Sequence, residues 1–492
     1  MGVIRRQSIV NTLTGYLGIV IAFISLLIVQ PNLLTPEEIG LTKILYNFSL
    51  LIATFVPMGI GNATTRFFPA FKDKEKNNHG YFAFMNLFPI AGFLIATILI
   101  FLLRNFILNQ YRTNSPLFLE FFNYIFPLIF FNSFIFVLSI YCNSNYKSTV
   151  PSFLNDVVVR ILVIVVVILY YFKLLNFDQF VFSFVAVYGI QLIALIGYIY
   201  QFDKPKLKID WQAFRERKFF SLIKFGLLVW FAGIAAIGLK YTDSIMIGKF
   251  LTLDYVGIYA IAALIPTVIE APLNALDRIA AAKISFAWKE GDTNTIYTIY
   301  HKSSLYMFLI GGFAFLLINA NIHSLLSFLK PEYQNGELVV LILSIGTLFN
   351  MATGLNAPIL FNSDKYRYGA VYLILLAGLI VVLQMIFIPL YGIYGAALAT
   401  CATSLIYNFI MFITVNKFFK LQPFDRKNLK VLFVIIAIFL SVFWLPNFSN
   451  AYLDILIRTM AVSFTYPLLI YFLNVAPEFH KYLPWEKSKY KS

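Results

Sequence analysis

The sequence has 492 residues, of which 60% are hydrophobic, 18% aromatic and only 12% charged. Soluble globular proteins carry about twice that charged fraction, and here apolar runs of about 20 residues recur from end to end. The composition therefore excludes a water-soluble protein and leaves little room for a catalytic domain outside the membrane. The net charge of +15 is explained by basic cytoplasmic loops, so we expect no nucleic-acid partner.

Hydropathy predicts fourteen transmembrane helices. Helices are favoured over barrel strands because the apolar residues run continuously instead of alternating. The expected ranges are 8–30, 40–60, 80–103, 116–142, 153–172, 180–201, 221–247, 255–276, 303–325, 337–360, 368–389, 394–416, 430–447 and 453–474. The first range is long and lacks a small-residue cleavage site, so we interpret it as a retained span and not as a signal peptide.

Most Lys and Arg residues fall in alternate connections, of which 202–220 is the longest. Because basic residues collect on the cytoplasmic side, this pattern predicts a multi-pass protein of the bacterial inner membrane with both termini in the cytoplasm. The external connections, such as 104–115, are too short for a membrane glycosyltransferase or polymerase. The sequence also lacks a GxxxxGK[ST] phosphate loop. We therefore expect a transporter without enzymatic activity.

Redox and metal chemistry are not expected. The two cysteines, Cys142 and Cys401, lie in apolar stretches, and the four histidines are scattered without metal-ligand spacing. Two cysteines cannot form a disulfide framework or a cysteine-rich metal site. The sequence thus predicts neither a metal nor another cofactor.

One internal repeat stands out. Residues 34–41 match residues 251–258 as L-T-x-[DE]-x-[IV]-G-[LI], an offset of 217 residues, and Arg66 falls on Lys283 at the same offset. Six predicted helices separate the two copies, so they share one orientation and predict parallel repeats around a central cavity. The alternative is that this motif is an ordinary entry into a helix with an acidic first turn.

The repeat predicts the domain organisation. An N-lobe over 1–201 contains helices 1–6, a cytoplasmic linker spans 202–220, and a C-lobe over 221–429 contains helices 7–12. Two appended helices occupy 430–474, and a cytoplasmic tail follows at 475–492. The predicted fold class is therefore an all-α polytopic membrane protein with two parallel six-helix lobes.

Five segments carry a resemblance to a known family: LLTPEEIGL after the first helix, YTDSIMIGKFLTLDYVGIYAIA across helices 7 and 8, KISFAWKEGD, KPEYQNG, and IPLYGIYGAALAT. In this order they resemble polysaccharide biosynthesis flippases of the O-antigen type, within the multidrug/oligosaccharidyl-lipid/polysaccharide exporter superfamily. The resemblance implies a two-lobed transporter that alternates between inward-open and outward-open states. Its implied cargo is an undecaprenyl-diphosphate-linked oligosaccharide moved from the cytoplasmic to the outer leaflet.

Cations inside the spans are candidates for binding the diphosphate, because charge within the hydrocarbon is costly unless it serves a function. Arg160 in helix 5 can form a forked hydrogen bond to phosphate. Asp156, four residues earlier, offers the alternative of an internal ion pair or a gating role. In helix 7, Lys240 is a second diphosphate candidate. Asp243, on the same face, is a candidate for gating or for binding a coupling cation, H⁺ or Na⁺, and the alternative is a structural salt bridge.

Further candidates lie near the helix ends. Lys43 faces the central cavity or extends to the headgroups. Glu270 is a lone carboxylate suited to proton coupling, unless it pairs with Arg278. Arg66 and Lys283 mark the cytoplasmic ends of helices 2 and 8 and either collect anionic headgroups and substrate or only set the orientation.

Asp454 and Arg458, spaced i, i+4, predict a structural ion pair in the last span. Two rival functions remain open: a lipid II flippase, and a cation-coupled multidrug exporter of the same superfamily. The exporter usually has twelve spans and an acidic cavity, whereas this sequence offers two appended helices and intramembrane cations.

Overall fold

The computed structural model describes residues 2–73, 75–216, 219–446 and 448–475, and every element in these ranges is helical. The predicted all-α membrane fold is confirmed. Of the described helices, nine are long and apolar enough to cross a membrane, or ten if α13 and α14 are counted as one span. Helical elements occupy most of each of the fourteen predicted ranges, but the number that cross the membrane stays a prediction.

The chain forms two compact units, Met1–Ala260 and Ile261–Ser492. The lobe boundaries at 201 and 221 stay a prediction. The elements of the first unit are α1 (Gly2–Phe23), η1 (Ile24–Val29), α2 (Gln30–Leu33), α3 (Pro36–Ala53), α4 (Ile60–Phe67), η2 (Phe68–Phe71), η3 (Asn77–Gly80), α5 (Tyr81–Tyr111), α6 (Pro116–Glu120), η4 (Phe122–Tyr124), α7 (Ile125–Ser144), α8 (Thr149–Phe153), η5 (Leu154–Val158), α9 (Val159–Tyr171), α10 (Phe177–Phe202), α11 (Trp211–Glu216), α12 (Phe219–Phe250) and α13 (Leu253–Leu264), which crosses the division.

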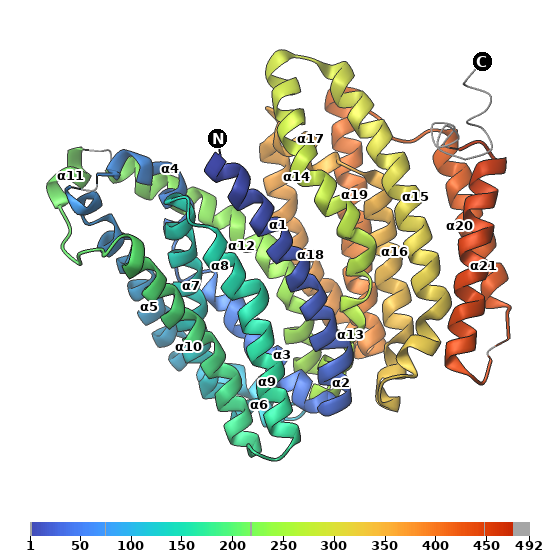
Figure 1. Ribbon diagram of the computed structural model, residues 1–492, viewed down its shortest axis with the longest axis horizontal. Coiled ribbons are helices and arrows are strands. Elements are labelled where there is room, and N and C mark those ends of the chain that lie inside the picture. Colours follow the sequence, from blue (N-terminus) through green and yellow to red (C-terminus); the bar gives the residue numbers. More distant parts are fainter. Residues whose placement is uncertain (1, 74, 217–218, 447, 476–492) are drawn as a thin grey trace. The chain divides into compact units, whose positions relative to one another are not determined.

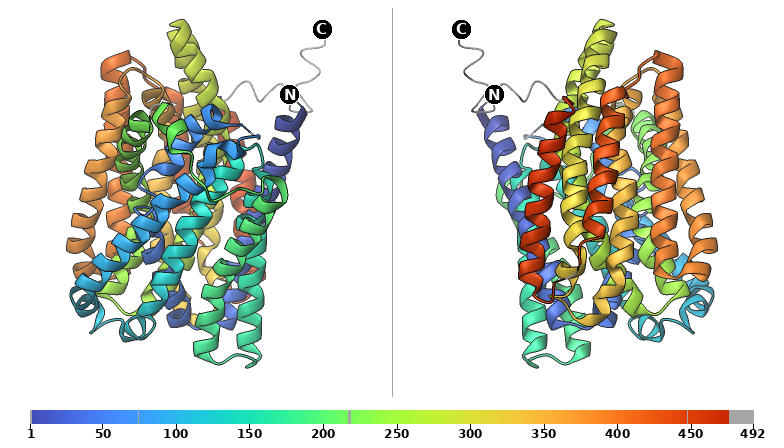
Figure 2. Two further views of the ribbon diagram at one scale, coloured as in Figure 1. Left: turned by 90° about the vertical axis from the view of Figure 1, so that its left-hand side faces the viewer. Right: turned by 90° about the vertical axis from the view of Figure 1, so that its right-hand side faces the viewer.

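The second unit is built on α15, which packs against four other helices of the unit. α20 and α21 lie side by side at its edge, as Figures 1 and 2 show. Its elements are α14 (Thr267–Glu290), α15 (Thr293–Leu326), η6 (Pro331–Gly336), α16 (Glu337–Thr353), α17 (Asn356–Phe361), α18 (Tyr366–Tyr391), α19 (Ile393–Phe419), α20 (Arg426–Phe443) and α21 (Ala451–Phe472).

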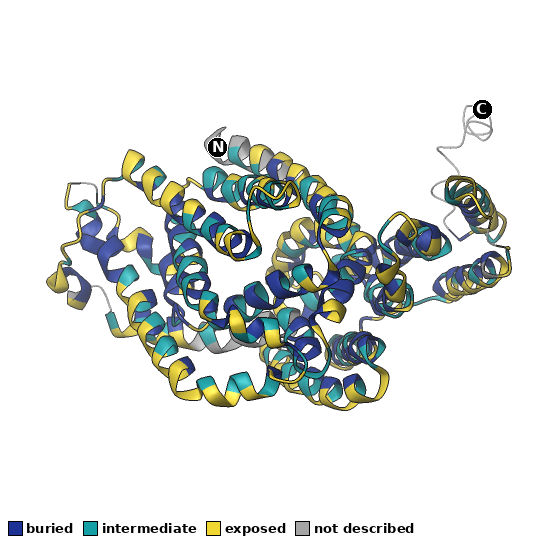
Figure 3. Cartoon of the chain, turned by 90° about the horizontal axis from the view of Figure 1, so that it is seen from below, coloured by how far each residue is buried: buried dark blue, intermediate teal, exposed yellow. Residues whose placement is uncertain are grey.

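Buried residues within each unit lie where helices face one another, and exposed apolar side chains point outward (Figure 3). Phe101, Leu102 and Phe464 are each 73% exposed. In water so much exposed apolar surface would drive aggregation. In a bilayer these side chains contact lipid, as expected for a multi-pass membrane protein.

The first copy of the repeated motif forms a capping box. Thr35 accepts a hydrogen bond from the backbone N–H of Glu38, and the Glu38 carboxylate accepts one from the backbone N–H of Thr35. Pro36 starts α3 where its missing N–H costs nothing. The box explains the Thr and acidic positions of the motif, because two otherwise unpaired N–H groups are satisfied by neighbouring side chains.

The glycines of the two copies bring the two helix starts together. A Cβ atom added at Gly40 in α3 would lie 1.9 Å from the carbonyl oxygen of Leu253. One added at Gly257 in α13 would lie 2.0 Å from the carbonyl oxygen of Pro36. Each copy therefore contacts the backbone of the other through its glycine, and any side chain at either position would push the helices apart.

The linker that follows α10 is held by an unusual turn. Asn77, Asn78, His79 and Gly80 are all left-handed, with φ of 52°, 50°, 54° and 73°. The His79 ring lies 3.1 Å from the Asp210 carboxylate, and the His79 carbonyl accepts the backbone N–H of Asp210. Left-handed backbone is costly for residues other than glycine, so these contacts with the linker help to hold the turn in place.

Stability is expected to depend on pH through this linker contact. The His79 hydrogen bond, with help from the backbone N–H of Ala213, holds the pKa of the Asp210 carboxyl below its usual value. A carboxyl whose pKa is lower in the folded than in the unfolded state stabilises above its unfolded pKa, and this contribution is lost as the pH falls through the folded pKa. Lowering the pH from about 6 to about 3 should therefore reduce the melting temperature of wild type more than that of Asp210→Asn.

Asp364 is exposed, and its carboxylate accepts no hydrogen bond from the part of the chain that the structure describes, so it serves as the control. Asp364→Asn should keep the wild-type pH dependence of melting. Equal pH dependence in wild type and Asp210→Asn would contradict the predicted role of the His79 contact.

Candidate substrate site

Arg160 is the second residue of α9, directly after the π-helix η5. Its guanidinium donates a hydrogen bond to the carbonyl of Gly18 in α1. The helices approach closely there, because a Cβ at Gly18 would lie 2.8 Å from the Cβ of Asp156. π-Helical turns are rare and are frequent at functional sites.

Asp156 does not pair with Arg160. In the described part of the chain no carboxylate lies within 4 Å of the Arg160 guanidinium, and Asp156 accepts a hydrogen bond of 3.1 Å from Asn155 instead. The predicted alternative of an ion pair is wrong because Leu154–Val158 is π-helical. The wider turn removes the i, i+4 alignment on which the pair depended.

Lys43 in α3 and Arg160 in α9 are 117 residues apart in sequence. The two charges lie close enough to act on one another, and Arg160 also acts on Tyr46, one turn along α3 from Lys43. All three side chains are partly buried. Two like charges held near one another in a partly dry site repel, and a bound anion would relieve this repulsion.

Aromatic side chains flank these cations. The Tyr46 ring stacks on that of Tyr188 in α10, with ring centroids 4.9 Å apart. Tyr188 is almost fully buried and presents one ring face to Tyr46. We call Lys43, Tyr46, Arg160 and Tyr188 the cation cluster.

Asp243 in α12 accepts a hydrogen bond of 2.6 Å from the hydroxyl of Tyr259 in α13. The side chain of Lys240 lies outside the described residues. The predicted pairing of Lys240 with Asp243, and the diphosphate role of Lys240, therefore stay predictions.

Glu270 in α14 accepts a hydrogen bond of 2.7 Å from the amide of Asn350 in α16. No ion pair joins Glu270 to Arg278 within the described ranges, and Arg278 is exposed. The alternative of a Glu270–Arg278 pair is thus wrong: Arg278 lies eight residues along α14, and its exposed side chain does not turn back to Glu270. Glu270 remains a partly buried carboxylate held by a neutral donor.

The two cations related by the repeat are both exposed, Arg66 in the last turn of α4 and Lys283 seven residues before the end of α14. Arg66 in α4 lies over the ring of Phe225 in α12, with the guanidinium carbon 4.5 Å from the ring centroid. Lys283 lies on α14. An arginine stacked on an aromatic ring keeps its N–H groups free at the ring edge for an anion.

Asp454 and Arg458 form the predicted structural ion pair. The Arg458 Nε atom lies 2.9 Å from both carboxylate oxygens of Asp454, and both side chains are buried. Ser324 in α15 donates a hydrogen bond of 2.6 Å to the same carboxylate. Through this bond the pair connects the start of α21 to α15.

Tyr46, Tyr188 and Asn350 belong to these sites but were not among the residues predicted from the sequence. A weak signal exists for Tyr46, which lies one turn from the intramembrane Lys43. No signal in the sequence distinguishes Tyr188 from the other 29 tyrosines, because only the packing of α10 on its neighbours selects it.

Comparison with protein families gives one match. Residues 4–276, slightly more than half of the chain, match the family described as polysaccharide biosynthesis protein. No curated protein sequence matches the chain significantly.

Several solved structures share the fold. A lipid II flippase MurJ in an inward closed conformation has a TM-score of 0.72 at 15% identity, with 95% of this chain and 99% of that chain covered. An inward-facing multidrug resistance MATE family transporter of the MOP superfamily has a TM-score of 0.63 at 12% identity, covering 83% and 93%. The Vibrio cholerae MATE transporter VcmN in its bent form has a TM-score of 0.51 at 11% identity, covering 85% and 98%. The fold is therefore one found in multi-pass membrane transporters.

The structural pair should respond to mutation as a buried ion pair does. Arg458→Met leaves the Asp454 carboxylate buried without its cation and should lower the free energy of unfolding by about 3–5 kcal/mol. The double variant Asp454→Leu/Arg458→Met removes both charges and should recover most of this loss. Unfolding of the purified protein in detergent measures both, and a double variant no more stable than Arg458→Met would contradict the assignment.

Proposed function

Because the chain belongs to the polysaccharide biosynthesis protein family, we propose that it is a flippase for undecaprenyl-diphosphate-linked oligosaccharide. It moves this lipid from the cytoplasmic to the outer leaflet of the inner membrane by alternating access, for the synthesis of surface polysaccharide. It breaks no covalent bond. Its partners are the lipid-linked oligosaccharide, the surrounding membrane lipids and a coupling cation, H⁺ or Na⁺.

The cation cluster is the observation that carries this proposal. A diphosphate brings negative charge that cannot cross about 30 Å of hydrocarbon without a counter-charge. Arginine has five N–H donors, and one of those of Arg160 is used by Gly18. The remaining donors and the Lys43 ammonium suit phosphate oxygens, and the bound anion offsets the repulsion between the two cations.

We propose further roles in transport for the other charged candidates. Arg66 and Lys283 collect the anionic lipid at the cytoplasmic face, and Lys240 adds a second intramembrane contact to the diphosphate. Glu270 takes up and releases the coupling cation, with Asn350 stabilising its ionised form. Asp243 and Asp156 act in gating, because α12, which carries Asp243, contacts α3 of the first repeat and Asp156 lies against Gly18 of the first span.

The close contact between Gly40 and Gly257 supports an external gate. The two repeat-related carboxylates Glu37 and Asp254 lie near enough at this contact to act on one another's charge. Their repulsion opposes closure, while the backbone contact at the glycines favours it. A contact balanced in this way can open at modest cost, as alternating access requires.

Two rival functions differ from the proposed one in the molecule that is transported. A lipid II flippase shares the anionic diphosphate and differs only in the sugar. A cation-coupled multidrug exporter would need an acidic binding surface, whereas the cation cluster is basic.

Replacing the cation cluster should abolish transport of the anionic lipid. In a strain lacking the native gene, Arg160→Ala and Lys43→Ala should each lower the rate at which lipid-linked glycan reaches the outer leaflet by about tenfold or more, the loss expected for one charge-assisted hydrogen bond. Arg112→Ala and Lys173→Ala remove exposed cations outside the cluster and should keep the wild-type rate. Normal appearance of the glycan in the outer leaflet without the protein would refute the proposal.

Locking the external contact should stop transport. In a background with the buried Cys142 and Cys401 changed to serine, Glu37→Cys and Asp254→Cys are introduced together and joined with a cleavable bismaleimide. Joining should block delivery of the glycan, cleavage of the linker should restore it, and neither single cysteine should respond. Full transport by the joined protein would mean that this contact does not open.

A further inference from the structure

The linker between α10 and α12 presents basic and apolar side chains that the proposed function does not use. Its described basic residues are exposed, and none of them forms an ion pair within the part of the chain that the structure describes. Leu207 is 73% exposed, Trp211 50%, and Phe220 at the start of α12 85%. We define the linker surface by these residues: Lys204, Lys206, Leu207, Lys208, Trp211, Arg215 and Phe220.

The acidic residues of the segment 203–215 are held by partners in the protein. Asp203 accepts hydrogen bonds from the hydroxyl of Tyr141 and from the amide of Asn78. The Asp210 carboxylate lies 3.1 Å from the His79 ring. Neither carboxylate pairs with a basic residue among the described residues, so the four cations of the linker surface keep a positive field toward the solvent.

Contacts with the turn at η3 hold the linker backbone in place. The backbone N–H of Lys206 donates 3.1 Å to Asn77 Oδ1. A Cβ atom at Gly80 would lie 2.0 Å from the carbonyl oxygen of Lys208, so the two backbones touch there. The lysine side chains therefore extend from a fixed backbone, and less conformational entropy is lost when they bind a ligand.

The linker surface lies where two spans leave the hydrocarbon. α10 ends at Phe202 and α5 starts at Tyr81, and both helices are long and apolar enough to cross a membrane. The linker follows α10 directly and packs on the turn before α5, and α11 lies at one end of the first unit (Figure 1). The distribution of basic residues predicts that this end faces the cytoplasm. The linker surface is therefore expected at the level of the lipid headgroups.

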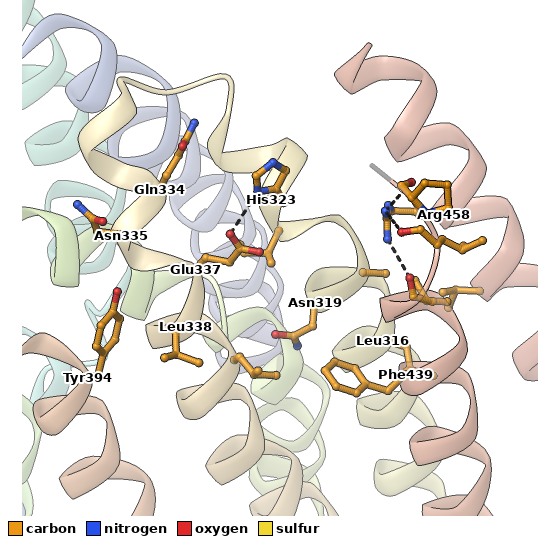
Figure 4. A pocket seen from close by; sticks show the side chains of 17 residues that line it. Leu316, Asn319, His323, Gln334, Asn335, Glu337, Leu338, Tyr394, Phe439 and Arg458 are labelled. Carbon is orange, nitrogen blue, oxygen red and sulfur yellow. Dashed lines mark hydrogen bonds and ion pairs between the residues drawn. The ribbon is translucent and has the colours of Figure 1, made fainter. Parts of the chain in front are cut away.

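The linker cations differ in availability from the buried arginine of the second unit. Arg458 lines a cavity of about 650 Å³ (Figure 4), but it pairs with Asp454 and donates to the carbonyls of Val442, Leu445 and Pro446. Its guanidinium is already surrounded by acceptors of the protein. The linker cations have no such partners in the described chain, so they can bind an anion from outside.

We propose that the linker surface binds anionic phospholipid of the cytoplasmic leaflet. The cations contact headgroup phosphates, while Leu207, Trp211 and Phe220 enter the headgroup and upper acyl region. A nucleic acid or an acidic protein matches the charge alone and leaves these apolar side chains in water. Each basic residue near an anionic membrane surface raises the affinity about fivefold. Binding of this kind rests on the predicted orientation in the membrane and does not depend on the transported cargo.

Photolabelling of the full-length protein in phosphatidylcholine nanodiscs tests the linker surface. Two trace probes, a phosphatidylglycerol and a phosphatidylcholine, carry the same diazirine close to the headgroup, and labelled positions are read by peptide mass spectrometry. The phosphatidylglycerol probe should label residues 204–215 about tenfold or more above the phosphatidylcholine probe. Raising the salt from about 0.1 M to about 1 M shortens the Debye length from about 10 Å to about 3 Å and should remove most of this difference.

A triple variant replaces three lysines of the linker surface by glutamine: Lys204→Gln, Lys206→Gln and Lys208→Gln. It should lower the ratio of the two labels about tenfold or more, because three charges near the headgroups are removed. The matched control replaces three exposed lysines on other connections of the predicted cytoplasmic side: Lys147→Gln, Lys289→Gln and Lys417→Gln. It changes the net charge equally and should keep the wild-type ratio.

Equal labelling by the two probes in the wild-type protein would overturn the proposal. So would a linker variant that keeps the wild-type ratio, or a control variant that loses it to the same extent. Displacement of the phosphatidylglycerol probe by inorganic phosphate or by an oligonucleotide, at the concentration of the probe, would assign the surface to a soluble anion and also overturn lipid binding. Transport is not measured, so a failure of the flippase function leaves this result unchanged.

Discussion

A backbone in hydrocarbon finds no water for its N–H and C=O groups, so each spanning segment must satisfy them itself as a helix. Helices in lipid then associate by close packing, which is strongest where a glycine lets two backbones meet. In the first unit this happens at Gly40 and Gly257, which bring the starts of α3 and α13 into reciprocal contact. The position of α3 in turn decides where Lys43 and Tyr46 lie, and thus the geometry of the cation cluster.

The charged residues within the spans are stabilised in different ways. Asp454 and Arg458 neutralise one another. Asp454 also accepts a hydrogen bond from Ser324, and Arg458 donates to backbone carbonyls, so the pair holds helices together. Glu270 is stabilised by one amide. Arg160 has a single backbone carbonyl and a neighbouring cation. Incomplete compensation of this kind costs stability, and it is expected where a ligand of opposite charge completes the site.

Local patterns predicted local structure well. The Thr35 and Glu38 positions of the repeated motif form a capping box, and the spacing of Asp454 and Arg458 places them on one helical face, where they pair. The same i, i+4 spacing did not produce an ion pair between Asp156 and Arg160, because a π-helical turn changes the number of residues per turn. Opposite charges spaced i, i+4 therefore pair in a regular α-helix and not across a π-helical turn, and the residue types do not reveal where such a turn occurs.

The sequence by itself determined that this protein is an all-helical membrane protein of the polysaccharide biosynthesis family, because apolar length, charge placement and motif order are properties of consecutive residues. Only the tertiary structure decided that the charges of Lys43 and Arg160 act on one another and that Tyr188 stacks on Tyr46. Such contacts join residues tens to more than a hundred positions apart, and they depend on which helix faces meet. Apolar helices in lipid have many faces of similar hydrophobicity, so that choice is made by close packing and not by composition.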